Sequence, residues 1–121
     1  MENALISTKN LTKIFHLSTG PLGRKKVFVH AVENVNIDIA SRETLALVGE
    51  SGCGKTTLGR LILRLIEPTK GEVLFKGENI FSLDRERMRS LRRDMQIIFQ
   101  DPYASLDPRM RILDILAEPL K

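Results

Sequence analysis

The sequence lacks several features on which whole classes of protein depend. It has no Trp and a single cysteine, Cys53, so no intrachain disulfide can form, in agreement with a reducing cytosol. No apolar stretch reaches the ~18 residues needed to cross a bilayer. The first four residues, Met-Glu-Asn-Ala, lack the basic-then-apolar layout of a signal peptide. His16 and His30 are isolated, and no Cys, His and acidic cluster has metal-ligand spacing. These absences argue against a secreted disulfide scaffold, a membrane-spanning chain and a zinc-type site.

What remains is an ordinary composition for one globular domain. The chain has 121 residues, of which 42% are hydrophobic and 28% charged. The net charge of +4 is mild, and a phosphate-binding protein needs no nucleic acid to explain it. Length and composition therefore indicate a single globular domain and do not indicate which molecules it binds.

The most specific signal is residues 49–56, Gly-Glu-Ser-Gly-Cys-Gly-Lys-Thr, which fit the phosphate-binding pattern G-x-x-x-x-G-K-[ST] without mismatch. The three glycines let the backbone curl tightly and bring its N–H groups near phosphates. Lys55 supplies a positive charge for the β- and γ-phosphates, and the Thr56 hydroxyl is placed to bind Mg²⁺. A Gly-rich turn that merely precedes a lysine is the weaker alternative.

The context of this loop supports the stronger interpretation. Residues 44–48, Thr-Leu-Ala-Leu-Val, form a short apolar run that predicts a buried strand before the loop. After it, apolar residues recur on one helical face, namely Leu58, Leu61, Ile62, Leu65 and Ile66. The thiol of Cys53 lies at a variable position, but the helix N-terminus and Lys55 are expected to lower its pKa.

The segments before the loop predict a small antiparallel sheet. Residues 4–11 predict a strand, residues 18–26 a loop with a basic end, and the alternation of Val35, Ile37 and Ile39 a half-buried strand. Phe15 follows the first strand. It could stack on an adenine base, but an ordinary core phenylalanine is the interpretation that the sequence alone favours.

The segments after the loop alternate between short strands and helices. Residues 67–71 predict a helix stop, residues 72–75 a strand, residues 76–79 a turn, and Ser82 or Asp84 the cap of a helix to about residue 93. Five arginines on that helix suggest either a nucleic-acid contact or a solvated face. The solvated face is favoured because acidic residues interleave them.

The last quarter of the chain predicts a second buried strand and a loop. Residues 96–99, Gln-Ile-Ile-Phe, are apolar and β-prone, and they place Gln100 at a carboxyl end of the sheet, where its amide could bind Mg²⁺ or orient a water. Two Asp-Pro steps make residues 101–108 a loop, and residues 109–116 begin another helix.

These residues together resemble a known family, the ATP-binding subunits of ABC transporters, and within it the dipeptide, oligopeptide and nickel importers. Three stretches carry the resemblance: residues 48–57, residues 58–71 and residues 95–109. The third is similar to the second of the two ATPase subunits that such importers often pair. The resemblance covers essentially the whole chain.

The resemblance implies a fold and a role for each matching residue. The fold is an α/β P-loop NTPase core, here incomplete, with an antiparallel β region over residues 1–43, a core over 44–100 and the start of a helical subdomain over 101–121. Phe15 matches the adenine-stacking aromatic, and Gln100 the glutamine that touches Mg²⁺ and the attacking water. The residues matching the phosphate loop are Gly49, Glu50, Ser51, Gly52, Cys53, Gly54, Lys55, Thr56 and Thr57.

The resemblance also implies partners, a location and a limit. ATP and Mg²⁺ are the expected ligands. The expected partners are a second ABC ATPase subunit, transmembrane permease subunits and, indirectly, an extracytoplasmic substrate-binding protein, on the cytoplasmic side of the membrane; no nucleic acid is expected. The family's signature motif, catalytic glutamate and switch histidine find no match in residues 1–121, so no catalytic residue is assigned and these residues alone are expected not to hydrolyse ATP. A soluble ABC-type ATPase acting on nucleic acid or translation, and a P-loop small-molecule kinase, are the alternatives.

Overall fold

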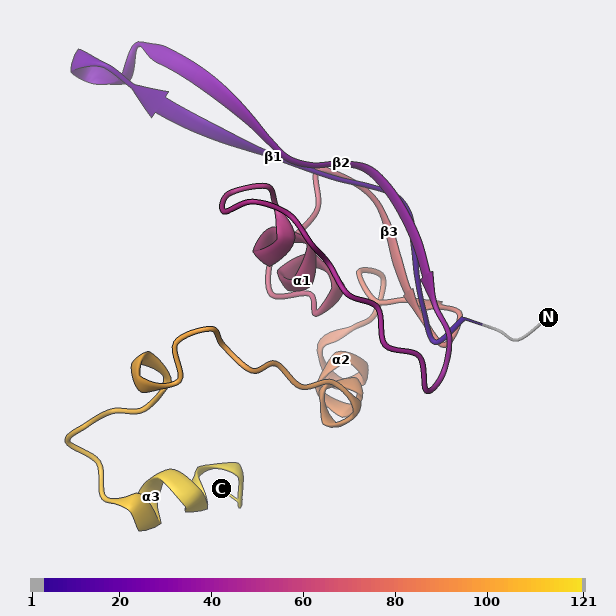
Figure 1. Ribbon diagram of the computed structural model, residues 1–121, viewed down its shortest axis with the longest axis vertical. Coiled ribbons are helices and arrows are strands. Elements are labelled where there is room, and N and C mark those ends of the chain that lie inside the picture. The colour runs from indigo at the N-terminus through magenta and orange to yellow at the C-terminus, as the bar shows by residue number, and fades with distance from the viewer. Residues whose placement is uncertain (1–3, 121) are drawn as a thin grey trace. The chain divides into compact units, whose positions relative to one another are not determined.

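The computed structural model describes residues 4–120, which form two compact units, one up to Ser90 and one from Leu91 onward (Figure 1). Residues 1–3 and 121 lie outside the described residues. They include both ends of the predicted domain and three of the four N-terminal residues that argue against a signal peptide. The predicted division at residues 43 and 100 stays a prediction. No helix in the described part of the chain is long and apolar enough to span a bilayer.

The first unit is built on a four-stranded antiparallel sheet with the order β2-β1-β3-β4. The strands are β1 (Ile6–Thr19), β2 (Lys25–Ile39), β3 (Lys70–Phe75) and β4 (Glu78–Asn79). A short 3-10 turn, Pro21–Gly23, joins β1 to β2. The first strand is longer than predicted, because its second half pairs with residues 25–30 of β2. Phe15 therefore lies within β1, opposite Val29, and the prediction that it follows the strand is wrong.

The long hairpin of β1 and β2 bends at one point along its length, where Asn10 of β1 and Asn34 of β2 lie. Asn10 and Asn34 both adopt left-handed backbone conformations, with φ of 48° and 49°, and the register shifts there. Two buried threonines hold the strands together around this bend. Thr8 donates its hydroxyl to the Val35 carbonyl, 3.0 Å away. The Thr12 hydroxyl accepts the Asn34 N–H at 3.0 Å. These bonds supply partners where the regular ladder is interrupted.

Two helices accompany the sheet, α1 (Lys55–Ile62) and α2 (Arg85–Leu91). The Asp84 carboxylate caps α2 by accepting the Arg87 N–H at 2.7 Å, as the sequence predicts. The helix α1 ends four residues before its apolar pattern does. The buried apolar core draws on both helices and on the sheet, and consists of Leu11, Val32, Leu58, Leu61, Val73, Phe75, Ile80 and Met88.

Two predicted buried strands are not strands in the structure. Residues 44–48 and 96–99 have no ladder partner within residues 4–120 and are exposed. Val48 is 95% exposed and Ile98 94% exposed. Such apolar runs are typical of parallel strands, which need a neighbour on each side and cover on both faces. All ladders between the described residues are antiparallel and involve other segments.

The second unit contains short helical segments joined by extended chain. They are 3-10 turns at Arg92–Asp94 and Tyr103–Ser105, the helix α3 (Ile112–Ala117) and a 3-10 turn at Glu118–Leu120. The Asp101 carboxylate accepts the Tyr103 N–H at 3.0 Å and so begins the turn at Tyr103–Ser105. Residues 101–108 form a loop with this one short turn, largely as predicted, and the predicted helix begins three residues later than expected.

Thr12→Val tests whether the Thr12 hydroxyl stabilises the hairpin at its bend. The change keeps the shape of a fully buried side chain but removes the acceptor of the Asn34 N–H, so we expect the free energy of unfolding to fall by about 1–2 kcal/mol. Urea denaturation measures this. Thr19→Val, at the exposed end of the same strand, is the control. Equal unfolding midpoints for the two variants would contradict the assignment.

Candidate functional site

The candidate site is the loop of residues 49–54 with the first turn of α1. At its centre lies the ammonium group of Lys55, which donates to the carbonyls of Gly49 and Glu50 at 2.6 and 2.8 Å. A turn closed by the Cys53 N–H and the Glu50 carbonyl, at 3.2 Å, shapes the loop. The lysine charge is thus held inside the curl of the loop backbone.

The first turn of α1 supplies further donors beside this charge. The first intrahelical bond runs from the Leu58 N–H to the Gly54 carbonyl at 2.9 Å. The amides of Lys55, Thr56 and Thr57 precede it and have no intrahelical acceptor. The positive end of the helix dipole adds to the attraction for an anion. Thr56 is exposed in this turn, and its hydroxyl is the hard oxygen donor that Mg²⁺ prefers.

Gly54 joins the loop to the sheet and must be glycine for two reasons. Its φ of +98° is left-handed, and a Cβ there would collide with the Ala31 carbonyl oxygen of β2. Gly52 shares the left-handed conformation, with φ +82°, but a Cβ on it would meet open space. Gly54 therefore allows the loop to approach β2 closely, whereas Gly52 is needed only for the backbone conformation of the turn.

A recess of about 250 Å³ lies where the loop meets β2. Its lining includes Ala31, Val32 and Glu33 from β2, Val48 before the loop, and Lys55. Sequence reasoning missed the contribution of β2, because only the register of the long hairpin brings residues 31–33 to the loop. Nothing in the local sequence of residues 31–39 predicts that residues 31–33 lie beside the phosphate loop.

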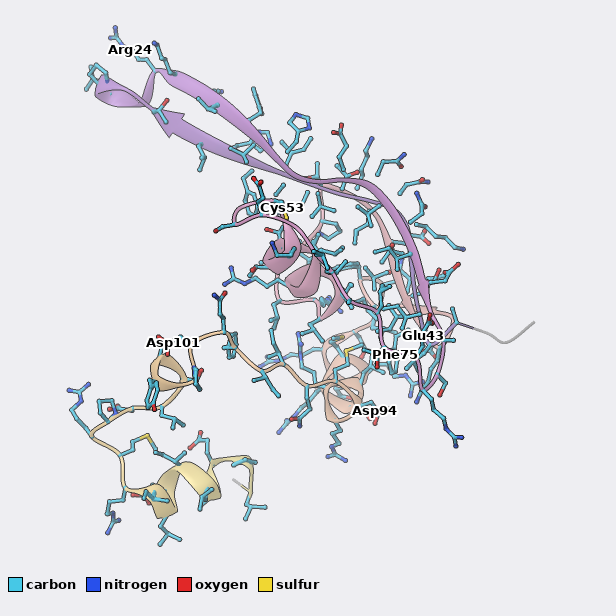
Figure 2. All side chains as sticks on the ribbon, viewed as in Figure 1. Arg24, Glu43, Cys53, Phe75, Asp94 and Asp101 are labelled. Atoms are coloured by element: carbon cyan, nitrogen blue, oxygen red, sulfur yellow. The ribbon has the colours of Figure 1, made fainter. Side chains whose placement is uncertain are left out.

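Cys53 is folded back into the loop. Its Sγ accepts from Lys55 Nζ at 3.3 Å, and a Cβ added at Gly49 would lie only 2.5 Å from the same sulfur. The hydrogen bond from Lys55 lowers the pKa of the Cys53 thiol below its usual range, outweighing desolvation. The thiol is exposed. In Figure 2, Cys53 lies at the end of α1 where the loop enters the helix.

The other two predicted ligands lie apart from the loop in the chain. Phe15 is partly exposed on β1, with Lys13 Nζ 5.1 Å from the centre of its ring, and is not among the residues that line the recess. Gln100 is exposed in the second unit, directly after residues 95–99, which form no regular secondary structure. The roles of Phe15 in stacking and of Gln100 in Mg²⁺ binding stay predictions.

The arginines of α2 lie on a solvated face. Arg85, Arg87 and Arg89 are all exposed. Arg87 is paired with Glu78 of β4 at 3.0 Å. This pairing and the interleaved acids agree with the solvated interpretation and leave the nucleic-acid alternative without support from contacts.

Comparison with known proteins gives consistent matches. A family model described as ABC transporter matches residues 32–118. The glutathione import ATP-binding protein GsiA of Escherichia coli K12 is 51% identical over 117 residues, which is 97% of this chain and 19% of GsiA. GsiA of Shigella dysenteriae serotype 1 has the same identity and coverage. The chain thus spans about a fifth of the length of these relatives.

Solved structures give the same result for the fold. The dimeric structure of MJ0796, a bacterial ABC transporter cassette, matches with a TM-score of 0.72 and 31% identity, over 95% of this chain and 46% of that one. The structure of cbiO1 from Clostridium perfringens, part of the ABC transporter complex cbiONQ, matches with a TM-score of 0.65 and 26% identity, over 88% and 38% of the two chains.

Gly54→Ala and Gly52→Ala separate the two glycine roles. Gly52→Ala introduces only left-handed strain, and we expect it to cost roughly 1 kcal/mol of stability. Gly54→Ala adds a collision with the Ala31 carbonyl, so its loss should be clearly larger. Thermal unfolding of both variants measures the difference. Equal losses would show that Gly54 does not rest on β2.

The reactivity of Cys53 tests the electrostatics of the loop. Because Lys55 stabilises the thiolate, alkylation by iodoacetamide should reach half its maximal rate at a lower pH than for a free cysteine. Lys55→Met should shift that midpoint upward, whereas Lys9→Met, on the sheet, should leave it unchanged. Mg-ATP should slow the reaction. Equal rates with and without Mg-ATP would contradict phosphate binding beside the thiol.

Proposed function

This chain belongs to the ABC transporter family, and we propose that it forms the nucleotide-binding part of the energy-coupling ATPase subunit of a membrane importer. The observation that carries the proposal is the position of Lys55, whose ammonium lies within the loop of residues 49–54 at the start of α1. The α/β P-loop fold, with its antiparallel sheet, agrees with a partial ABC ATPase core. The predicted resemblance to this family is confirmed.

ATP is proposed as the ligand of this loop. Lys55 would exchange its two carbonyl acceptors for oxygens of the β- and γ-phosphates, and the amides of Lys55, Thr56 and Thr57 would donate to the same anion. Each charge-assisted bond is stronger than the bonds to neutral carbonyls that it replaces. The exchange requires little movement, because the ammonium group already lies inside the loop.

Mg²⁺ is proposed to accompany ATP, with Thr56 as one ligand and Gln100 as a second. When bound, the ion neutralises charge on the phosphate oxygens. The Thr56 hydroxyl fits this role by its chemistry and its place in the first turn of α1. Phe15 is proposed to stack on the adenine ring. Its support is a partly exposed ring on β1, near a lysine that can hold the ring in place through a cation–π contact.

Hydrolysis and transport are proposed for the whole protein, of which this chain supplies the part that holds the phosphates. ATP binding would close a pair of ATPase subunits and hydrolysis would open it, and the segment after Gln100 would pass this change to the permease. The proposed partners are a second ATPase subunit, membrane permeases and, indirectly, an extracytoplasmic binding protein. The proposed location is the cytoplasmic face of the membrane.

The proposed cargo is a small peptide or a related solute. Two relatives that are 51% identical over nearly all of this chain carry the name glutathione import ATP-binding protein, and glutathione is itself a small peptide. The likeness extends well beyond the phosphate loop, over 117 residues.

Lys55→Ala in the whole transporter tests the proposal. The change removes a charge-assisted phosphate contact worth ~1.5–3 kcal/mol. We expect binding of a fluorescent ATP analogue to weaken at least tenfold and ATP-dependent uptake of labelled glutathione or dipeptide to stop. Lys9→Ala, which removes an exposed lysine from the sheet, is the matched control. Unchanged nucleotide binding and uptake in Lys55→Ala would refute the assignment.

A further inference from the structure

The outer half of the β1–β2 hairpin has no partner strand in the described chain. We name this part the arm and define it as residues 15–29. β3 pairs with β1 no further than Thr12, and the last contact beside it joins Thr69 to Ile14. Beyond that point the two strands pair only with each other, from Phe15 opposite Val29 to Thr19 opposite Lys25. In Figure 1 the arm extends away from the rest of its unit.

The arm exposes an unusual amount of apolar surface for a soluble hairpin. A two-stranded ribbon cannot bury both of its faces, so soluble proteins usually place polar residues there. Here the exposed large apolar side chains are Phe15, Leu17, Leu22, Val27, Phe28 and Val29. The most exposed of them is Leu22 at the tip, at 87%.

The backbone at the tip is strained at this leucine. Leu22 has φ 66° and ψ 19°, a left-handed conformation that costs a residue with a Cβ roughly 1–2 kcal/mol. Gly20 and Gly23 on either side, with φ of 91° and 65°, adopt positive φ without this penalty. Backbone strain of this kind clusters at binding and other functional sites.

The charge of the arm has one sign. No Asp or Glu occurs in residues 3–32, although the chain contains 15 acidic residues elsewhere. Arg24, Lys25 and Lys26 follow Leu22 after one glycine and are all exposed, and none of them forms an ion pair with another described residue. Figure 2 shows Arg24 at the far end of the arm. The tip thus joins an exposed leucine to a cluster of three unneutralised cations.

We propose that the tip of the arm binds the surface of an anionic lipid bilayer, with Leu22 entering the interfacial region and Arg24, Lys25 and Lys26 contacting lipid phosphates. Apolar insertion combined with a basic cluster is the combination that gives peripheral membrane binding, since either element alone is weak. The proposal adds a direct lipid contact to the membrane location proposed above. It needs neither nucleotide nor permease.

The same features fit a nucleic acid less well. Single-stranded nucleic acids bind basic grooves through aromatic faces on which bases stack. The side chain at the tip is aliphatic, and the ring of Phe28 already makes an edge contact with His16, with the ring centres 4.9 Å apart. Lipid surfaces accept aliphatic side chains directly, so the observations favour lipid.

Flotation of the purified whole protein with vesicles tests this, with phosphatidylcholine–phosphatidylglycerol vesicles set against pure phosphatidylcholine vesicles. We expect binding to the anionic vesicles only, weakened by salt. Replacing Arg24, Lys25 and Lys26 together by Gln should lower the partition coefficient about 100-fold, because each basic residue near an anionic surface contributes about fivefold. The matched control replaces Arg85, Arg89 and Arg93 by Gln, which removes the same charge from acid-interleaved segments, and should bind like the unmodified protein.

Leu22→Asn tests insertion without endangering the fold. Asparagine tolerates left-handed φ better than leucine, so the hairpin should be at least as stable, while vesicle binding should fall about tenfold through loss of a buried apolar side chain. Leu22→Trp also introduces a reporter at the tip, and the emission that it adds to that of the unmodified protein should shift to shorter wavelength on anionic vesicles.

Three results would overturn the proposal. They are absence of binding to anionic vesicles, an equal loss in the Arg85/Arg89/Arg93 control, or binding of a mixed-sequence single-stranded oligonucleotide that depends on the tip when vesicle binding does not. Because the assay contains no ATP, its failure would leave the phosphate loop assignment intact. Failure of the Lys55→Ala test would likewise leave the lipid contact intact.

Discussion

Hydrogen bonding along both edges of β1 is the constraint on which the first unit depends. β2 and β3 pair with β1 from opposite sides, and the threonines at positions 8 and 12 supply bonds where the ladder is interrupted. The same pairing sets the height of Ala31 on β2, against which Gly54 rests. The phosphate loop therefore packs through Gly54 against β2 of the antiparallel sheet. The position of Lys55 depends on this contact as well as on the loop itself.

Features that depend on a few adjacent residues could be predicted from the sequence. The loop curls around Lys55, Asp84 caps α2, and Lys76–Gly77 turn the chain after β3, because glycine, lysine and a short acidic side chain act through neighbouring backbone groups. The lowered pKa of Cys53 belongs to the same class, since its cause lies two residues away. The family resemblance also came from contiguous stretches.

Features that depend on distant partners could not be predicted in this way. Residues 44–48 and 96–99 have the composition of buried strands, but a ladder needs a second segment, and no described residue supplies it. The apolar period of α1 runs to Ile66, yet the helix ends at Ile62, where Arg64 turns with φ 50° and donates to the Ile80 and Leu83 carbonyls at 2.7 and 2.9 Å. The apolar periodicity of the sequence does not predict the bonds of Arg64 to those carbonyls, nor the contact of Gly54 with Ala31.

The paired left-handed asparagines at positions 10 and 34 have a consequence for how this hairpin can vary in evolution. Beyond Ile14, four residues past Asn10 along β1, the two strands pair only with each other, while the register around Asn10 and Asn34 is held by β3 and the buried threonines. Inserting or deleting one residue in each strand of the arm would change its reach by about 3.4 Å without altering the register of the sheet. The length of the arm is thus a quantity that selection can adjust independently of the nucleotide loop.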